Sequence, residues 1–178
     1  MLQMTKKPLE EEAQAFVSAE KGVETVEDAL NGAKDILAET ISDEADYRIY
    51  IRDLTMKKGS VASAAKKPEE SSVYEMYYEF EEPAEKLAGH RILALNRGEK
   101  EKFLTVKVQA PEEEILRYLE KKVIVNENIY TTEVLKETVA DSYNRLIAPA
   151  IEREIRSELT ERAENGAIEV FGKNLHQL

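Results

Sequence analysis

The feature that most constrains the fold is an apolar line along the C-terminal part of the chain. From Thr132 onward, hydrophobic residues recur at helical spacing, first from Val134 to Ile147 and then from Ile151 to Phe171. Pro149 interrupts this line, and because proline has no backbone N–H we expect it to kink the helix or to start a new one. The second part alone would form a helix of about 25 residues, roughly 37 Å long. Such a helix is long for a small globular domain, and it predicts a segment that bridges to something else.

The polar side of this helix carries opposite charges at helical spacing. Glu152 lies four residues before Arg156, and Glu158 lies four residues before Arg162. Residues at this spacing are neighbours on a helix surface, and the acidic residue comes first, which is the favoured order. We therefore expect two ion pairs within the helix.

The sequence pattern of the first 59 residues predicts a helical arm of three helices. The first spans Pro8 to Ser18, where apolar residues recur at helical spacing. The second begins after Thr25, because Thr25 and Asp28 form a near capping box ahead of a long apolar stripe. The third opens near Ser42 and ends in two lysines and a glycine, the usual order at a helix C-terminus.

Residues 60–130 predict helices with a minor β element. Ser60 to Ser72 is small and polar, which favours an exposed loop or a short edge strand. Ser72 to Phe80 fits helical spacing, and we prefer a helix there, although its aromatic residues also suit a strand. Leu104 to Val108 alternates apolar and polar residues, as a half-buried strand does, and Val123 to Val125 is a second candidate strand.

The chain is acidic and lacks the residues that several kinds of site require. Its 178 residues suffice for a folded core, and its formal net charge of −11 argues against the whole chain wrapping DNA or RNA. It has no cysteine, which excludes disulfides, a thiolate nucleophile and cysteine zinc sites. The two histidines, His90 and His176, have no catalytic partner nearby in sequence. We therefore expect no enzyme, no cofactor and no metal site.

The chain also lacks the signals of membrane or secreted proteins. No apolar run approaches the roughly 18 residues that a membrane-spanning helix needs. The N-terminus has no apolar core or small-residue cleavage site, so it does not fit a signal peptide. We expect a cytoplasmic protein with no membrane partner.

One stretch reverses the charge balance of the chain. From Lys86 to Lys107, six basic residues face two acidic ones, which leaves a local excess of +4. Within this stretch Ile92 and Leu95 would share one side of a short helix, whereas Arg97 would lie on the opposite side. The apolar side must be buried in any fold, and the basic side is available for a partner.

Three longer stretches resemble the bacterial transcription accessory protein family, Tex. In chain order they are "GVETVEDALNGAKDILAETISDEADYR", "YEMYYEFEEPAEKLAGHRILALNRGEKEKFLTV" and "SYNRLIAPAIEREIRSELTERAENGAIEVFGKNLHQL". The resemblance covers nearly the whole chain from about Gly22. Its most specific parts are the "EDALNGAKDIL" helix, the "HRILALNRGE" segment and the "IEREIRSELTERAE" helix.

The resemblance implies a multidomain, non-enzymatic protein that binds nucleic acid and is related to a eukaryotic elongation factor that also chaperones histones. A helical N-terminal region with a helix-turn-helix-like element would precede an RNase-H-like domain, helix-hairpin-helix repeats and a C-terminal OB-fold RNA-binding domain. On this reading the chain is an internal helical fragment that ends just before the RNase-H-like domain. The domains credited with most nucleic-acid binding would then lie outside it. Gly89 departs from the family, in which a serine often stands at this position, and this changes the expected helix cap.

The basic stretch contains the candidate nucleic-acid contacts. A short helix from Pro83 to Ala88, a turn at Gly89, a second helix from His90 to Gly98 and the strand after it have the outline of a winged helix-turn-helix. In that geometry arginine and asparagine side chains meet bases, and lysines meet phosphates. The residues expected in these roles are Arg91, Asn96 and Arg97 at bases, and Lys100 and Lys102 at phosphates. The alternative is a structural turn whose arginines pair with nearby carboxylates such as those of Glu81, Glu82 and Glu85.

Two other residue groups have simpler explanations than a site. The glutamate runs Glu10–Glu12 and Glu112–Glu114 stand at helix starts, where acidic residues complement the helix dipole, so a hydrolase with paired carboxylates is disfavoured. The aromatic residues at Tyr74, Tyr77, Tyr78 and Phe80 could stack on single-stranded bases, but core packing is the better explanation.

The sequence as a whole predicts a mainly α fold, a helical scaffold with a helix-turn-helix-like element, a minor β-strand or hairpin and a long C-terminal helix. We expect three parts: a helical arm over residues 1–59, a helix-turn-helix-like subdomain over 60–130 and a long helix over 131–178 leading toward the next domain. The expected function is a non-catalytic scaffold segment of a Tex-like nucleic-acid-binding protein, with RNA or DNA bound mainly by domains outside this chain. The alternative is an acidic module that docks on the transcription or translation machinery.

Overall fold

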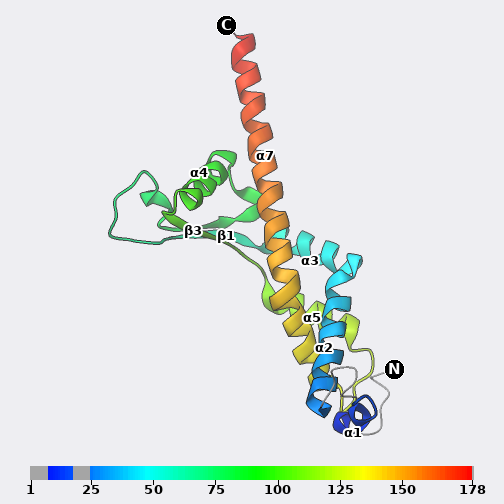
Figure 1. Ribbon diagram of the computed structural model, residues 1–178. Coiled ribbons are helices and arrows are strands. Elements are labelled where there is room, and N and C mark those ends of the chain that lie inside the picture. The colour runs from blue at the N-terminus through cyan, green and yellow to red at the C-terminus, as the bar shows by residue number, and fades with distance from the viewer. Residues whose placement is uncertain (1–7, 18–24, 178) are drawn as a thin grey trace. The chain divides into compact units, whose positions relative to one another are not determined.

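The computed structural model describes residues 8–17 and 25–177 (Figure 1). It is mainly α-helical, with one three-stranded antiparallel sheet and a long C-terminal helix, so the predicted fold class is confirmed. Contacts within the chain define two compact units: unit 1 is Met1–Ile49 with Glu112–Pro149, and unit 2 is Tyr50–Pro111 with Ala150–Leu178. The three consecutive parts predicted from the sequence stay a prediction, because compactness does not show which segment folds alone.

The described part of unit 1 is built from helices. Thr25 caps α2 as predicted: its hydroxyl accepts a hydrogen bond from the Asp28 N–H at 3.1 Å, and the Asp28 carboxylate accepts one from the Thr25 N–H at 3.3 Å. The helix expected from Pro8 is short, and its expected end at Ser18 lies outside the described residues. The elements are α1 (Leu9–Gln14), α2 (Val26–Asp43), the first residues of α3 (Ala45–Lys58), α5 (Glu112–Val123), α6 (Thr132–Asp141) and the π-helical segment η5 (Ser142–Ile147).

Apolar side chains from α2, α5, α6 and η5 form the core of unit 1. The buried residues of these elements include Ala38, Ile41, Ile115, Leu119, Leu135, Val139, Tyr143 and Ile147. The buried Ser142 hydroxyl donates a hydrogen bond to the backbone carbonyl of Ala38 at 2.6 Å, which joins η5 to α2. The rings of Tyr47 and Tyr118 meet edge to face, with centroids 6.1 Å apart. The core of unit 1 is therefore mainly apolar, and the Ser142 hydrogen bond links two of its helices.

The long helical run changes its geometry next to Pro149. The N–H of Ala148 donates to the carbonyl of Tyr143, five residues earlier, so η5 closes with a π-type hydrogen bond. Pro149 then occupies the second position of α7 (Ala148–His176). The backbone stays helical from α6 through η5 into α7, and Ala148 has right-handed helical dihedral angles. Pro149 therefore does not start a separate helix, and the π-helical segment before it is where the run adjusts to the missing N–H.

Unit 2 contains all the strands of the described structure, in the order β2-β1-β3. The central strand is β1 (Ser60–Ala65), which pairs antiparallel with β2 (Glu79–Pro83) and with β3 (Leu104–Gln109). The strand expected as one alternative in Ser60 to Ser72 forms over Ser60–Ala65, but its edge position was wrong, because backbone hydrogen bonding on both sides makes it the central strand. β3 alternates as predicted, with Leu104 and Val106 buried and Thr105 and Lys107 exposed.

Two local predictions in this region were also wrong. The helix expected from Ser72 to Phe80 is only a short 3-10 turn, η3 (Glu75–Tyr77), and its last residues enter β2. Pairing with β1 satisfies the backbone from Glu79 to Pro83. Val73 and Met76 are exposed, whereas Tyr77 is buried. The candidate strand Val123–Val125 does not form, because α5 continues through Val123.

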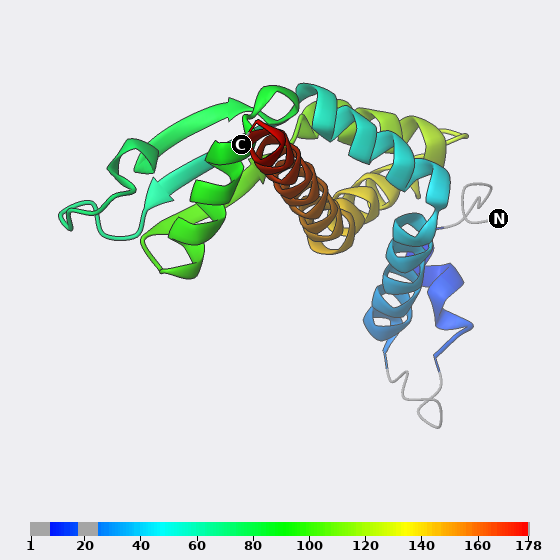
Figure 2. The ribbon, with the colours of Figure 1, turned by 90° about the horizontal axis from the view of Figure 1, so that it is seen from above.

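The core of unit 2 lies between the sheet, α4 (Gly89–Lys100) and α7 (Figures 1 and 2). Residues from β1, β3, α4, α7 and the loop before α4 surround one small space. They include Val61, Leu87, Ile92, Leu95, Val106 and Leu159. Gly89 is the first residue of α4 rather than a separate turn, and a Cβ there would lie 3.3 Å from the Cα of Ala163. A glycine therefore lets α4 approach α7 closely.

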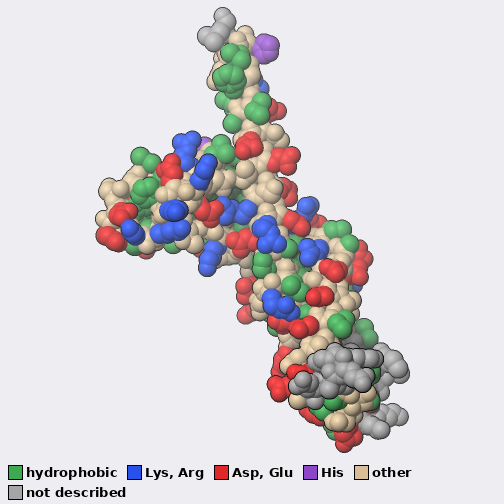
Figure 3. Space-filling view, viewed as in Figure 1, with side chains coloured by type: hydrophobic (Ala, Val, Ile, Leu, Met, Phe, Trp, Pro, Cys, Tyr) green, Lys and Arg blue, Asp and Glu red, His purple; other side chains and the backbone are tan. Residues whose placement is uncertain are grey.

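The last turns of α7 carry apolar side chains on the surface. Ile151, Ile155, Leu159 and Ala163 are buried, but beyond Ala163 the apolar residues are exposed. They are Ile168, Val170, Phe171 and Leu175, with exposed fractions of 69%, 60%, 65% and 55%. Figure 3 shows hydrophobic side chains standing on the surface of this part of the helix. No helix among the described residues is both long and apolar enough to cross a membrane.

Candidate nucleic-acid interface

The basic stretch folds as a 3-10 turn, one α-helix and a strand. The short helix expected before Gly89 is a three-residue turn, η4 (Ala84–Lys86), and α4 and β3 follow it. Ile92 and Leu95 of α4 are buried, as the sequence requires. The polar side of α4 therefore decides which of the predicted contacts are available to a partner.

Arg91 is held by its own unit. Its guanidinium donates a hydrogen bond to the Glu82 carboxylate at 2.5 Å and lies over the ring of Phe80, 5.6 Å from the centroid. Glu82 is one of the carboxylates that the alternative explanation named. Phe80 in turn packs edge to face against Tyr77 at 5.2 Å. Arg91 thus joins α4 to β2, and it would have to leave both contacts to reach a base.

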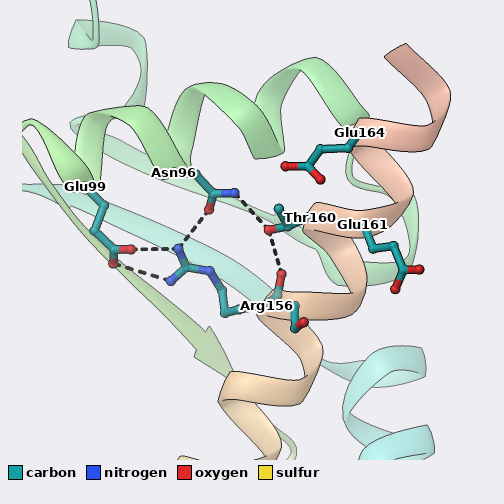
Figure 4. A pocket seen from close by; sticks show the side chains of 7 residues that line it. Asn96, Glu99, Arg156, Thr160, Glu161 and Glu164 are labelled. Carbon is teal, nitrogen blue, oxygen red and sulfur yellow. Dashed lines mark hydrogen bonds and ion pairs between the residues drawn. The ribbon is translucent and has the colours of Figure 1, made fainter. Parts of the chain in front are cut away.

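Asn96 is also occupied, in a network that joins α4 to α7 (Figure 4). Its amide donates to the Thr160 hydroxyl at 2.9 Å, and its carbonyl oxygen accepts from Arg156 at 3.0 Å. Arg156 donates through two nitrogens to the Glu99 carboxylate, at 2.8 and 3.4 Å. The Thr160 hydroxyl closes the network by donating to the Arg156 carbonyl at 2.8 Å. Every polar group of the Asn96 side chain that points toward α7 therefore has a structural partner.

Sequence reasoning missed this network because its members are far apart in the chain. Arg156 was expected to pair with Glu152, but its partner is Glu99 of α4. Arg162 was expected to pair with Glu158, but it donates to the backbone carbonyls of Ala84 and Leu87 at 3.4 and 3.3 Å. The only sequence signal was the position of these arginines on the side of α7 next to its buried stripe. A shallow hollow borders the network, and Glu161 and Glu164 on its wall make it unsuitable for an anion.

The remaining three predicted contacts, Arg97, Lys100 and Lys102, are exposed at the end of α4, and we call them the basic cluster. Within the part of the chain that the structure describes, none of them forms an ion pair with a carboxylate. The two acidic residues between them have other partners: Glu99 binds Arg156, and Glu101 accepts a hydrogen bond from the Tyr74 hydroxyl at 2.7 Å. Burial and this hydrogen bond raise the pKa of Tyr74. Both local acids therefore have partners of their own, Arg156 and Tyr74, whereas the three cations have no carboxylate partner in the described structure.

The surface around the basic cluster is mixed in charge but locally rich in cations. Figure 3 shows Lys and Arg side chains over α4 and the sheet, with acidic side chains between them. The aromatic residues of this region have packing roles: Tyr74 and Tyr77 are buried, and Tyr74 lies 5.7 Å from the ring of Phe103. No group of His, Asp or Glu side chains in the described residues is arranged to hold a metal ion.

A family model for the Tex central region matches residues 3–171 of the chain. The chain belongs to the Tex family. A relative from Bacillus subtilis, the uncharacterized protein YdcI, is 52% identical over 169 residues, which are 93% of this chain and 24% of the relative. The human S1 RNA-binding domain-containing protein 1 is 34% identical over 172 residues, 89% of this chain and 17% of that protein.

A further relative has transcription in its name. The transcriptional accessory protein Tex of Neisseria gonorrhoeae is 26% identical over 182 residues, 98% of this chain and 24% of that protein. The chain therefore spans a quarter or less of each of these relatives, and they contain long regions that it does not match.

Proposed function

We propose that the chain is a non-catalytic scaffold segment of a Tex-like transcription accessory protein, and that it contacts nucleic acid weakly through the basic cluster. The observation that carries this proposal is the pairing pattern of α4. Arg97, Lys100 and Lys102 are exposed without carboxylate partners, although the chain as a whole carries −11. Three cations correspond to few phosphate contacts, so the affinity would be low and strongly dependent on salt.

The names of the relatives support the same function. One is a transcriptional accessory protein, and another contains an S1 RNA-binding domain. In such a protein the main nucleic-acid binding would come from regions outside this chain. Arg91 and Asn96, which the sequence also suggested, act in this proposal as structural residues that hold α4 in place.

The test is a binding measurement with a charge-matched control. Fluorescence anisotropy of a labelled nucleic acid at low salt should report weak binding by the 178-residue chain. Replacing the three residues of the basic cluster by alanine should abolish that binding. The control replaces three exposed cations of unit 1, Arg117, Lys121 and Lys136, by alanine, and it should bind as the wild type does. Equal losses in both variants would show that only net charge matters and would refute the assignment.

The exposed end of α7 supports a scaffold role for the same chain. Ile168, Phe171 and Leu175 share one side of α7 at helical spacing and form an apolar surface that the described residues do not cover, whereas Val170 lies on the opposite side. We propose that another region of the parent protein packs on this surface. In the full-length protein Phe171→Asp should lower the protease resistance of the helix, while in the 178-residue chain the same substitution should change little.

A second candidate function rests on unit 1. It contains 20 acidic and 10 basic residues, a formal net charge of −10, and it would dock on a basic protein of the transcription or translation machinery. Neutralising exposed acids of α2, such as Glu39 and Asp43, should then weaken retention of the chain on a basic partner at moderate salt.

A further inference from the structure

We propose that the basic cluster binds the phosphate backbone of double-stranded nucleic acid without reading its sequence. This inference rests on the proposed function, and it adds the kind of strand that the site selects. Two of the three side chains expected to read bases are occupied, and only Arg97 remains exposed. Arg91 is bound to Glu82, and Asn96 is bound to Thr160 and Arg156. Bidentate contacts from arginine or asparagine are the usual means of reading base edges, so the engagement of Arg91 and Asn96 leaves Arg97 as the one side chain of the basic cluster that could make such a contact. A single arginine is too few to specify a sequence.

The aromatic residues that could stack on single-stranded bases are also occupied. Tyr74 is buried against Phe103 and donates its hydroxyl hydrogen bond to Glu101. Phe80 lies beneath the guanidinium of Arg91, and the Tyr78 hydroxyl donates to the Glu70 carbonyl at 2.6 Å. Proteins that hold single strands usually combine a basic groove with exposed aromatic platforms. The surface near the basic cluster has the cations, but its aromatic rings are used for packing.

The cations that remain are gathered by backbone hydrogen bonds at one end of unit 2. The Phe103 N–H donates to the Gly98 carbonyl at 2.9 Å, and the Lys66 N–H donates to the Phe103 carbonyl at 2.9 Å. The exposed Lys66 therefore lies beside the turn that carries Lys102. A duplex presents about one charge per 1.7 Å along its axis, a higher density than a single strand, so compact point charges favour it.

Lys102 has a backbone conformation that glycine would favour. Its φ angle is 68°, and it is the only non-glycine residue of the described chain with positive φ. The Lys102 N–H donates to the Glu99 carbonyl at 3.1 Å, which with the Phe103 bond forms a Schellman motif at the end of α4. Glycine is the usual residue at this position because a side chain there is strained. A lysine kept at a strained position is explained if its charge is used.

The experiment combines two substitutions of Lys102 with three nucleic-acid probes. Lys102→Gly removes the charge and relieves the strain, whereas Lys102→Ala removes the charge and keeps the strain. Binding of the 178-residue chain is measured with a duplex of about 20 base pairs, a duplex of scrambled sequence and the corresponding single strand. We expect equal affinity for the two duplexes, weaker binding of the single strand, and about fourfold weaker duplex binding by both variants at low salt. Only Lys102→Gly should raise the unfolding midpoint, by about 2 °C.

The outcomes separate this inference from the proposed function. If none of the probes binds, the proposed function fails. If the single strand binds more tightly than the duplexes, or if the duplexes differ in affinity, the proposed function stands and this inference is wrong. Unchanged duplex binding by Lys102→Gly would also overturn it. A lower unfolding midpoint for Lys102→Gly would show that the lysine stabilises the turn rather than straining it.

Discussion

Unit 1 contains 20 acidic and 10 basic residues, and unit 2 contains 16 acidic and 15 basic residues, so their formal net charges are −10 and −1. The larger difference lies in how these charges are paired. In unit 2 the acids Glu82, Glu99 and Glu101 accept hydrogen bonds from Arg91, Arg156 and Tyr74. This internal pairing leaves the basic cluster without carboxylate partners in the described structure. The pairing of carboxylates with neighbouring donors, rather than net charge, therefore decides whether an acidic chain can offer a site for a polyanion.

The largest expected effect concerns the apolar core of unit 1. Leu119 is fully buried in unit 1. Leu119→Ala should lower the free energy of unfolding by about 3 kcal/mol, through lost burial and a residual cavity. Hydrogen exchange measured by mass spectrometry should show lower protection in α5 and α6. Leu116→Ala, at a half-buried position of the same helix, is the control and should have a smaller effect.

The next effect tests the polar network of unit 2. Arg156→Ala leaves Glu99 and Asn96 without their partner and should lower the free energy of unfolding by about 2 kcal/mol. The loss of stability is smaller than for a buried pair, because the Glu99 side chain is 41% exposed and water can hydrate its charge. Hydrogen exchange should increase in α4 and the adjoining part of α7, and Arg153→Ala at an exposed position of α7 should change little. A uniform loss of protection in both units would contradict a network local to unit 2.

A smaller effect is expected at the start of α2. Thr25→Ala removes the hydroxyl of the capping box and should lower the stability of this helix by about 1 kcal/mol. Thr25→Ser keeps an oxygen at the same position and should restore most of the loss. Amide exchange in the first turn of α2 measures both variants. If alanine and serine behave alike, the cap does not stabilise the helix.

The effect that is smallest at neutral pH concerns Tyr143. Burial raises the pKa of Tyr143 from 10.0 to about 12, and the charge of Glu112 adds to the shift. The pKa of Tyr143 is higher in the folded protein than in the unfolded chain. The contribution of its neutral hydroxyl to the stability of the folded protein is therefore complete below pH 10 and is lost as the pH rises through 12. Chemical denaturation between these pH values should show a decline in stability that is reduced in Tyr143→Phe. An equally steep decline in that variant would assign it to other groups.

Local patterns predicted much of the fold. The capping box of Thr25, the alternation of β3 and the buried face of α4 depend on neighbouring residues, and each formed as the sequence indicated. The stretch from Ser72 to Phe80 was assigned wrongly because its helical spacing competes with pairing to β1, a contact that sequence spacing does not reveal. Small residues such as Ala62 likewise gave no sign of a central strand.

The candidate site was predictable in position but not in detail. The charge reversal pointed to α4, and three of the five proposed residues are exposed cations. The roles of Arg91 and Asn96 depend on partners that lie in other elements, and Asn96 meets a residue 64 positions away. For Arg156 the sequence predicted only an ion pair with Glu152 on the surface of the same helix. Contacts at such separations follow from the packing of helices, so one sequence could not show which cations remain available.

The central claim is that pairing within unit 2 leaves the basic cluster as the place where a polyanion binds. Lysine footprinting by acetylation and mass spectrometry, with and without duplex nucleic acid, tests it most directly. We expect protection of Lys100 and Lys102, and equal labelling of Lys121 and Lys136 of unit 1 in both conditions. Protection of the unit 1 lysines, or labelling of Lys100 and Lys102 that the duplex leaves unchanged, would contradict the claim.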